Sequence, residues 1–240
     1  MNTRKLLEYS YENGLSHIAS ALSMLDYVDV LFSEKIIVPY RDHIVIGKPF
    51  GAQAYYLVWQ EQGYIGEIRD LSVGVKHDEL FFVDYGEETM GNAVGVAAGI
   101  AMANPDKRVW VNISDATLQM GNTIEALQFI GFNNIKNILV TVDYNGAQVT
   151  GSIGDILPVR PVIQMCRLYS WWVQEVDGHN RQSIKEACKN FVSTVPNIMF
   201  FKTQKGHGVK SIEQDIKKWH YKKIETLSEL QSLVAGLPAT

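Results

Sequence analysis

Apolar runs and helical patterns alternate along most of the chain. Short runs rich in apolar and β-branched residues predict strands at residues 44–46, 108–113, 137–142, 171–176 and 197–202. Patterns typical of helices lie at residues 3–11, 20–32, 91–103, 117–130 and 183–195. In the third of these helices Gly91, Gly95 and Gly99 recur every four residues, which predicts a smooth face for close packing against a strand or a second helix.

The order of these elements favours one fold class. A helix stands between the strands at 108–113 and 137–142, and another between those at 171–176 and 197–202, as in the βαβ units of a parallel sheet. No internal repeat and no Ser/Gly-rich linker divides the chain. We therefore predict a single α/β domain over residues 1–240, with a doubly wound, mainly parallel sheet covered by helices on both faces.

Composition narrows the class of protein. Of the 240 residues, 46% are hydrophobic and 20% are charged, which is typical of a soluble globular protein. The longest strongly apolar stretch, residues 93–103, is too short to span a bilayer, and residues 1–8 have no secretory apolar core. We expect a cytoplasmic protein with no membrane partner.

Charge and cysteine content exclude further classes. The formal net charge of -4 argues against nucleic acid as a partner, because binding to a phosphate backbone requires clustered Lys and Arg. One basic cluster is interpreted as a solvated surface: Lys217, Lys218, Lys222 and Lys223. Cys166 and Cys188 lie in no CxxC motif and have no histidine at ligand spacing, so we predict neither a disulfide framework nor a zinc site.

Polar side chains follow two of the predicted strands. Ser114, Asp115 and Ala116 come after the strand at 108–113, and Asn145 and Gly146 follow the strand at 137–142. Ligands of parallel sheets bind at the carboxyl ends of strands, so a carboxylate and an amide oxygen there would suit Mg²⁺ carrying a diphosphate. The alternative is structural, with Asp115 capping a helix and Asn145 forming a turn. The residues alone leave both readings open.

Seven segments, in order, carry a resemblance to a known family. They are GLSHIASALS at 14–23, TMGN at 89–92, SDATLQMG at 114–121, DYNGAQ at 143–148, VDGHN at 176–180, KTQKGHGV at 202–209 and WH at 219–220. Together they resemble the N-terminal, diphosphate-binding domain of transketolase, and in particular the separately encoded N-terminal subunit of split transketolases.

The resemblance implies thiamine diphosphate and Mg²⁺ as cofactors. Asp115, Asn145 and the backbone carbonyl of Ala147 would hold the metal. The expected cofactor-binding residues are Met90, Gly91, Ser114, Asp115, Ala116, Asn145 and His220. His17 would be catalytic, beside the substrate carbonyl, where an imidazole donates a hydrogen bond and moves protons. His77 is a weaker match to another substrate-facing histidine.

The chain also departs from the family pattern. Ser114 and Ala116 replace two glycines, which would be strained if either position required a positive φ. Met120 replaces an acidic residue, and Phe50 replaces a histidine expected near the diphosphate and substrate. These changes put the substrate in doubt.

The implied activity is transfer of a two-carbon ketol unit from a ketose, a sugar or sugar phosphate, to an aldehyde. Only residues 221–240 follow the WH segment, too few for the pyrimidine-binding domain that such enzymes need. We therefore expect the partner to be a separately encoded C-terminal transketolase subunit, in an α₂β₂ assembly. The alternatives are another two-subunit thiamine diphosphate enzyme, for example one that decarboxylates 2-oxoacids, and a catalytically decayed regulatory subunit.

Overall fold

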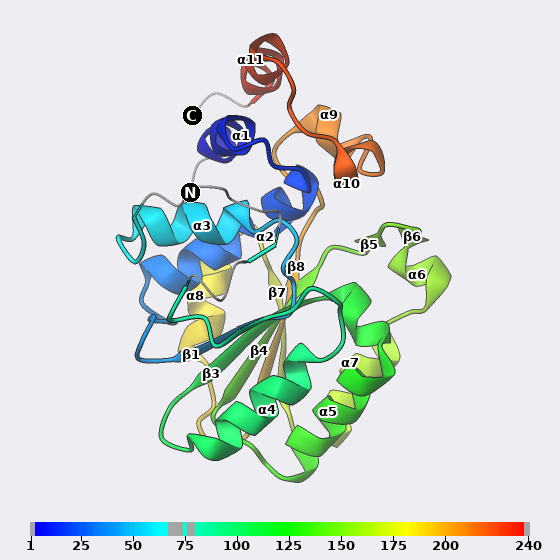
Figure 1. Cartoon of the computed structure of the whole chain (residues 1–240). Helices are drawn as coiled ribbons and strands as arrows, with labels where there is room; N and C mark the ends of the chain where they lie inside the picture. The colour runs from blue at the N-terminus through cyan, green and yellow to red at the C-terminus, as the bar shows by residue number, and fades with distance from the viewer. Residues whose placement is uncertain (1–2, 67–73, 76–79, 238–240) are drawn as a thin grey trace.

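A six-stranded parallel sheet forms the centre of the molecule (Figure 1), seen in a computed structural model that describes residues 3–66, 74–75 and 80–237. Its strand order is β2-β1-β3-β4-β8-β7, and every neighbouring pair within it is parallel. The strands are β1 (His43–Ile46), β2 (Tyr85–Gly86), β3 (Val109–Ser114), β4 (Ile138–Tyr144), β7 (Trp172–Asp177) and β8 (Asn197–Lys202). A small antiparallel pair consists of β5 (Ala147–Gln148) and β6 (Gly151–Ser152).

Helices cover both faces of this sheet, as the sequence predicts (Figure 1). One face carries α2 (Ile18–Ser33), α3 (Gln53–Glu61) and α8 (Arg181–Lys189), and the other carries α4 (Ala93–Ala103), α5 (Gly121–Phe132) and α7 (Arg160–Leu168). Two hydrophobic cores result, and alternate residues of β3 serve them: Trp110 packs in the first, Val109 and Val111 in the second. The remaining helices are α1 (Thr3–Glu12), α6 (Ile153–Ile156), α9 (Lys210–Glu213), α10 (Lys218–Tyr221), α11 (Leu227–Ala235) and the 3₁₀-helix η1 (Asp115–Gln119).

The predicted strands are confirmed to within about one or two residues, whereas two helical predictions need correction. The segment 117–130 is divided into η1 and α5, because the backbone of Met120 is extended. The helix predicted at 183–195 ends earlier, since α8 stops at Lys189. The loop after it is held to the start of β8, because the Asn197 side chain forms hydrogen bonds with the backbone of Val192. The sequence patterns did not predict α3 or α7.

The predicted glycine face is wrong. Helix α4 begins at Ala93, and Gly95 and Gly99 are exposed rather than packed. A Cβ at Gly99 would meet no atom within 4 Å, and one at Gly95 would approach only the Ala126 Cβ, at 3.9 Å. Gly91 precedes the helix with a φ of 125°, a region that favours glycine. The closest packing of α5 is instead at Gly131, where a Cβ would lie 2.5 Å from the Tyr169 carbonyl oxygen.

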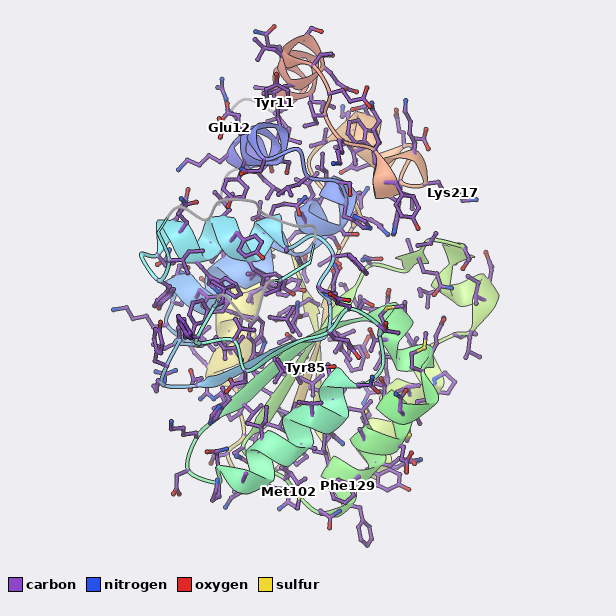
Figure 2. All side chains as sticks on the ribbon, viewed as in Figure 1. Tyr11, Glu12, Tyr85, Met102, Phe129 and Lys217 are labelled. Carbon is purple, nitrogen blue, oxygen red and sulfur yellow. The ribbon has the colours of Figure 1, made fainter. Side chains whose placement is uncertain are left out.

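Three further features of the described residues concern helix length, the cysteines and the surface. No helix of the described residues is long and apolar enough to cross a membrane. Both cysteines are free. Lys217 points away from the fold, as do Met102 and Phe129 at the far end of α4 and α5 (Figure 2).

The register of β3 and β4 positions the polar residues that follow them. Ser114 pairs with Asp143, so Asp115 and Asn145 leave the sheet side by side at its carboxyl edge. The segments after β1 and β8 reach the same edge, because these strands run parallel to β3 and β4.

Candidate functional site

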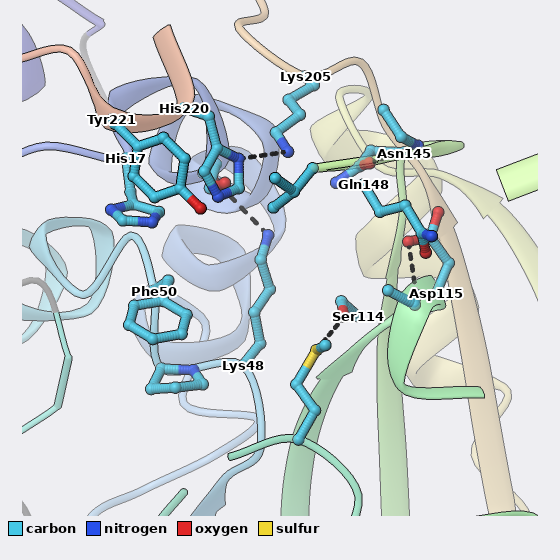
Figure 3. Close-up of a pocket in the computed structure, with 16 residues that line it drawn as sticks. His17, Lys48, Phe50, Ser114, Asp115, Asn145, Gln148, Lys205, His220 and Tyr221 are labelled. Carbon is cyan, nitrogen blue, oxygen red and sulfur yellow. Dashed lines mark hydrogen bonds between the residues drawn. The ribbon is translucent and has the colours of Figure 1, made fainter. Parts of the chain in front are cut away.

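One pocket at the carboxyl edge of the sheet collects nearly all the residues selected from the sequence (Figure 3). Its lining includes eight of them: His17, Met90, Ser114, Asp115, Ala116, Asn145, Ala147 and His220. Gly91 lies next to Met90 but does not line the pocket. His77 falls outside the described residues.

Asp115 is a nearly fully buried carboxylate without a salt bridge in the described part of the chain. Its oxygens accept hydrogen bonds from two backbone amides, Ala116 N at 2.8 Å and Gly146 N at 2.6 Å. Burial, followed by the nearby negative charge of Asp143, raises the pKa of Asp115 to about 7. A cation bound beside it would favour the charged form.

Asn145 makes the turn that the structural alternative expected. Its Oδ1 accepts a hydrogen bond from Ala147 N at 3.0 Å, and its Nδ2 donates to Asp143 at 2.8 Å. The other half of that alternative does not hold, because Ser114 rather than Asp115 forms the capping box of η1, with Thr117. A turn does not exclude a metal, since Oδ1 and the Ala147 carbonyl keep lone pairs for it.

Asp143 lies behind the lining and bonds two of the residues that line the pocket, Lys48 and Asn145. Its carboxylate is fully buried, forms a salt bridge with Lys48, and accepts hydrogen bonds from Ser23 at 2.7 Å and Thr203 at 2.5 Å. Burial alone would raise the pKa of Asp143, but Lys48 and these hydroxyls hold it below its usual value. Asp143 also receives the Asn145 amide, so it fixes the orientation of that side chain.

Lys205 brings a second buried charge to the pocket, and it has no carboxylate partner among the described residues. Its Nζ lies 3.4 Å from Nδ1 of His220. Burial, and then repulsion from Lys48, lowers the pKa of Lys205 to about 8. The pKa of His220 falls to about 4, first through burial and then through the charge of Lys205. This side of the pocket is suited to an anion.

His17 has the backbone conformation of a residue under local constraint. Its φ of 59° and ψ of 26° are left-handed, which is uncommon for a residue other than glycine and is concentrated at functional sites. The ring accepts or donates a hydrogen bond with Ser16 Oγ at 2.9 Å and contacts His220 edge-on, with ring centroids 4.7 Å apart. Burial, then His220, lowers the pKa of His17 to about 4, so the imidazole is neutral at pH 7.

The departures from the family pattern have different structural consequences. Ser114 has a φ of -100°, and Ala116 is not among the described residues with positive φ, so neither replacement of glycine strains the backbone. Met120 stands at the start of α5 and does not line the pocket. Phe50 lines the pocket and contacts His17.

The sequence predicted no role for two lysines of the pocket lining, Lys48 and Lys205, or for Asp143, which pairs with Lys48. Lys205 lies within one of the seven segments that resemble the family, and Lys48 lies two residues before Phe50, but a lysine at either position is equally compatible with an exposed surface. Their burial, at 7% exposure each, and their convergence on one pocket are visible only in three dimensions.

Comparisons with known proteins show which sequences and folds the chain is similar to. Residues 70–155 match the family described as thiamine pyrophosphate enzyme, C-terminal TPP binding domain. Transketolase of Mus musculus is 28% identical over 87% of the chain. The 6-deoxy-6-sulfo-D-fructose transketolase subunit of Clostridium sp. strain MSTE9 is 26% identical over 93% of it. An apulose-4-phosphate transketolase subunit from Phocaeicola vulgatus is 23% identical over 92%.

The chain covers different shares of these relatives' own lengths. The chain spans 36% of the mouse transketolase, but 90% of the Clostridium subunit and 85% of the Phocaeicola subunit. In fold, it is similar to transketolase from Leishmania mexicana, with a TM-score of 0.75 at 18% identity over 97% of this chain and 43% of that one.

Proposed function

Because the chain is a homologue of transketolases and of separately encoded transketolase subunits, we propose that it is the diphosphate-binding subunit of a two-component transketolase. One observation carries this proposal. The same lining contains a buried carboxylate, Asp115, and a buried ammonium, Lys205, and neither forms a salt bridge within the described residues. A metal ion and a diphosphate, bound together, would satisfy both charges.

The donor set fits Mg²⁺, which prefers oxygen ligands and retains water and phosphate oxygens. Asp115, the Asn145 amide oxygen and the Ala147 carbonyl would hold the ion, and the Asp143 carboxylate keeps the Asn145 side chain oriented. A neutral ligand bound in the same pocket would need no metal ion, and so would not require the buried carboxylate of Asp115.

Thiamine diphosphate fits the opposite side of the pocket. Lys48 and Lys205 would neutralise the diphosphate, and His220 would donate a hydrogen bond to it. Met90, Ser114 and Ala116 would surround the cofactor with small or apolar surface, and Gly91 would support Met90 from behind the lining. When bound, the cofactor supplies the nucleophilic carbon and the electron sink for breaking and forming a carbon–carbon bond.

His17 would act on the substrate. Its neutral imidazole, which contacts the rings of Phe50 and Tyr221, would donate a hydrogen bond to a substrate oxygen or accept a proton from it. The charge of a bound diphosphate would raise its pKa toward the physiological range.

A partner chain would complete the site. The two relatives that are themselves called transketolase subunits match this chain over most of their length. We propose that the partner is a separately encoded C-terminal, pyrimidine-binding subunit, and that the two form an α₂β₂ assembly. We further propose cytoplasmic localisation, and a sugar or sugar phosphate as substrate.

The test is reconstitution. The chain should be purified with the product of the neighbouring gene that encodes a pyrimidine-binding transketolase half, and assayed with Mg²⁺ and thiamine diphosphate. Ketol transfer between a ketose and an aldehyde supports the proposal. Cofactor binding without turnover would indicate a decayed subunit, and turnover of 2-oxoacids alone would indicate the other two-subunit enzyme class.

A further inference from the structure

A His–Asp pair outside the pocket holds the segment that carries Lys205. We propose that His179, oriented by Asp26, is a positioning residue for Lys205. The inference rests on the proposed function, in which Lys205 contacts the cofactor diphosphate. It assigns a role to a histidine to which neither the family resemblance nor the pocket lining gives one.

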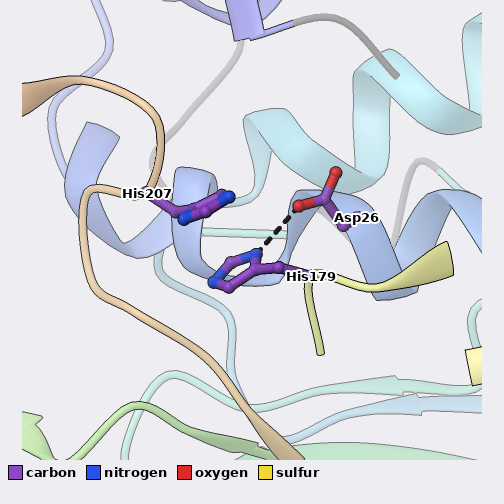
Figure 4. A group of neighbouring side chains, drawn as sticks. All are labelled: Asp26, His179 and His207. Carbon is purple, nitrogen blue, oxygen red and sulfur yellow. Dashed lines mark hydrogen bonds and ion pairs between the residues drawn. The ribbon is translucent and has the colours of Figure 1, made fainter. Parts of the chain in front are cut away.

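Hydrogen bonds connect Asp26, on α2, to the segment after β8. Nδ1 of His179 lies 2.8 Å from the Asp26 carboxylate (Figure 4), and the backbone N of Gln204 donates to Nε2 of His179 at 2.8 Å. Since Nε2 accepts, the proton of the neutral ring is on Nδ1, where it bonds Asp26. Asp26 therefore fixes the tautomer of His179 in which Nε2 can accept a hydrogen bond from the Gln204 amide.

The local backbone is built for this contact. Gly178, next to His179, lies so close to the segment after β8 that a Cβ there would be 2.5 Å from Thr203 Cγ2 and 3.0 Å from Phe201 Cβ. The His179 amide is itself held by Asp177 Oδ1 at 3.0 Å. The absence of a side chain at residue 178 thus allows the imidazole to reach the Gln204 amide.

Lys205 is fixed from both neighbouring residues. Gln204 N bonds His179, and Gly206 N donates to the carbonyl of Ala19, on α2, at 2.9 Å. The side chain between them reaches His220 in the pocket (Figure 3). Loss of the His179 bond leaves only the turn bond from His207 N to the Gln204 carbonyl, at 3.1 Å, on that side of Lys205, so the ammonium is positioned less firmly.

The same side chains have a second possible use, as metal ligands. Asp26, His179 and His207 offer ligand atoms within 4.8 Å of one another. However, both nitrogens of His179 are already engaged, and its ring is stacked on His207, with centroids 3.5 Å apart and planes at 16°. Nearly parallel rings do not direct their lone pairs at a shared ion, so the geometry favours the hydrogen-bonded role.

The test compares variants of the full chain, each assembled with its partner subunit, in titrations with Mg²⁺ and thiamine diphosphate, and with Mg²⁺ and inorganic pyrophosphate. His179→Phe keeps the stack on His207 but removes the acceptor, and His179→Gln provides an oxygen at a similar distance. His43→Ala is the matched control, because His43 forms the same kind of pair with Asp84, at 2.8 Å, at the opposite end of the sheet. Melting curves identify any variant that does not fold, in which case His179→Gln and Lys205→Met remain informative.

We expect His179→Phe to weaken binding about tenfold, the effect of one lost hydrogen bond, with His179→Gln within about threefold of the wild type and His43→Ala unchanged. In a Lys205→Met background, His179→Phe should have no further effect. If His179→Phe binds with unchanged affinity, or if the losses of affinity from His179→Phe and Lys205→Met add in the double variant, this inference is overturned while the proposed function stands. Failure of the wild type to bind either ligand would overturn the proposed function as well. Stoichiometric Zn²⁺ binding that His207→Ala abolishes would assign a metal site instead.

Discussion

The ring of Phe50 stacks on the imidazole of His17, with centroids 5.0 Å apart and an angle of 19° between the planes. A histidine in place of Phe50 would offer a polar contact beside His17, whereas phenylalanine offers apolar surface. We therefore expect phosphorylated pentoses to be poor substrates of the reconstituted enzyme, relative to an unphosphorylated or otherwise altered sugar.

The measurement is steady-state kinetics of the pair, with Phe50→His as the comparison. We expect kcat/KM for xylulose 5-phosphate and ribose 5-phosphate to lie below about 10⁴ M⁻¹s⁻¹ and to rise about tenfold in Phe50→His. Higher efficiency in the wild type, unchanged by the substitution, would mean that Phe50 only supports the ring of His17.

Asp115→Ala should remove Mg²⁺-dependent binding of thiamine diphosphate, because the diphosphate would then enter a buried site without its metal. We expect affinity in the assembled complex to fall more than about 100-fold. Calorimetry with and without Mg²⁺ provides the measurement, and Asp106→Ala, an exposed aspartate, is the control. Unchanged affinity would remove the metal assignment.

The isolated chain should have no ketol-transfer activity, and its partner should restore it. The physical reason is that the proposed pocket holds the diphosphate, while activation of the cofactor requires contacts with its pyrimidine ring from the partner. Assays of the chain alone, of the partner alone and of the mixture test this. Robust turnover by the single chain, free of contaminating transketolase, would contradict the two-component proposal.

Diphosphate affinity should decrease as the pH rises through about 8. The pKa of Lys205 in the free protein is lowered to about 8, by burial and then by Lys48, so the ammonium loses its proton above that pH. A bound diphosphate favours the charged form, so binding takes up a proton there, and affinity falls by up to about tenfold per pH unit. Titrations from about pH 7 to about pH 9.5 should show this slope in the wild type, and a flat profile in Lys205→Met.

Gly131→Ala should destabilise the fold, because its Cβ would lie 2.5 Å from the Tyr169 carbonyl oxygen. We expect a loss of about 1–3 kcal/mol in the free energy of unfolding. Gly99→Ala is the opposite case, because Gly99 lies in a helix and a Cβ there would meet no atom within 4 Å. This substitution should raise the free energy of unfolding by roughly 0.5–1 kcal/mol. Urea unfolding of the two variants measures both signs, and equal effects would contradict this account of the packing.

The core of the site was predictable because parallel strands leave a strong pattern. Apolar runs ending in Asp115 and Asn145 indicated neighbouring strands, and the register of β3 and β4 confirms that the two residues meet. The family resemblance assigned His17 and His220 to one site, but it did not predict the contact between their rings, and no periodicity relates residues so far apart.

Other features depend on tertiary packing that local patterns do not encode. The spacing of Gly95 and Gly99 is compatible with close packing, but the alanines of α4 face the core instead. The burial of Lys205 follows from the way residues 203–206 cross α2, through the bond from Gly206 N to the Ala19 carbonyl. Sequence alone indicated a surface lysine equally well.

The Asp143 carboxylate also determines when the pocket can form during synthesis. Its partners Ser23, Lys48 and Thr203 are 120, 95 and 60 positions away along the chain. Consider a nascent chain in which Thr203 has not yet left the ribosome. Its strand β4 has no completed β8 beside it, and Lys205 is not yet available. Contacts between such distant segments form late, so the cofactor pocket should be among the last regions to become ordered. Ribosome-bound chains that end before residue 203 should accordingly gain no protease resistance from Mg²⁺ and thiamine diphosphate, whereas released full-length chains should.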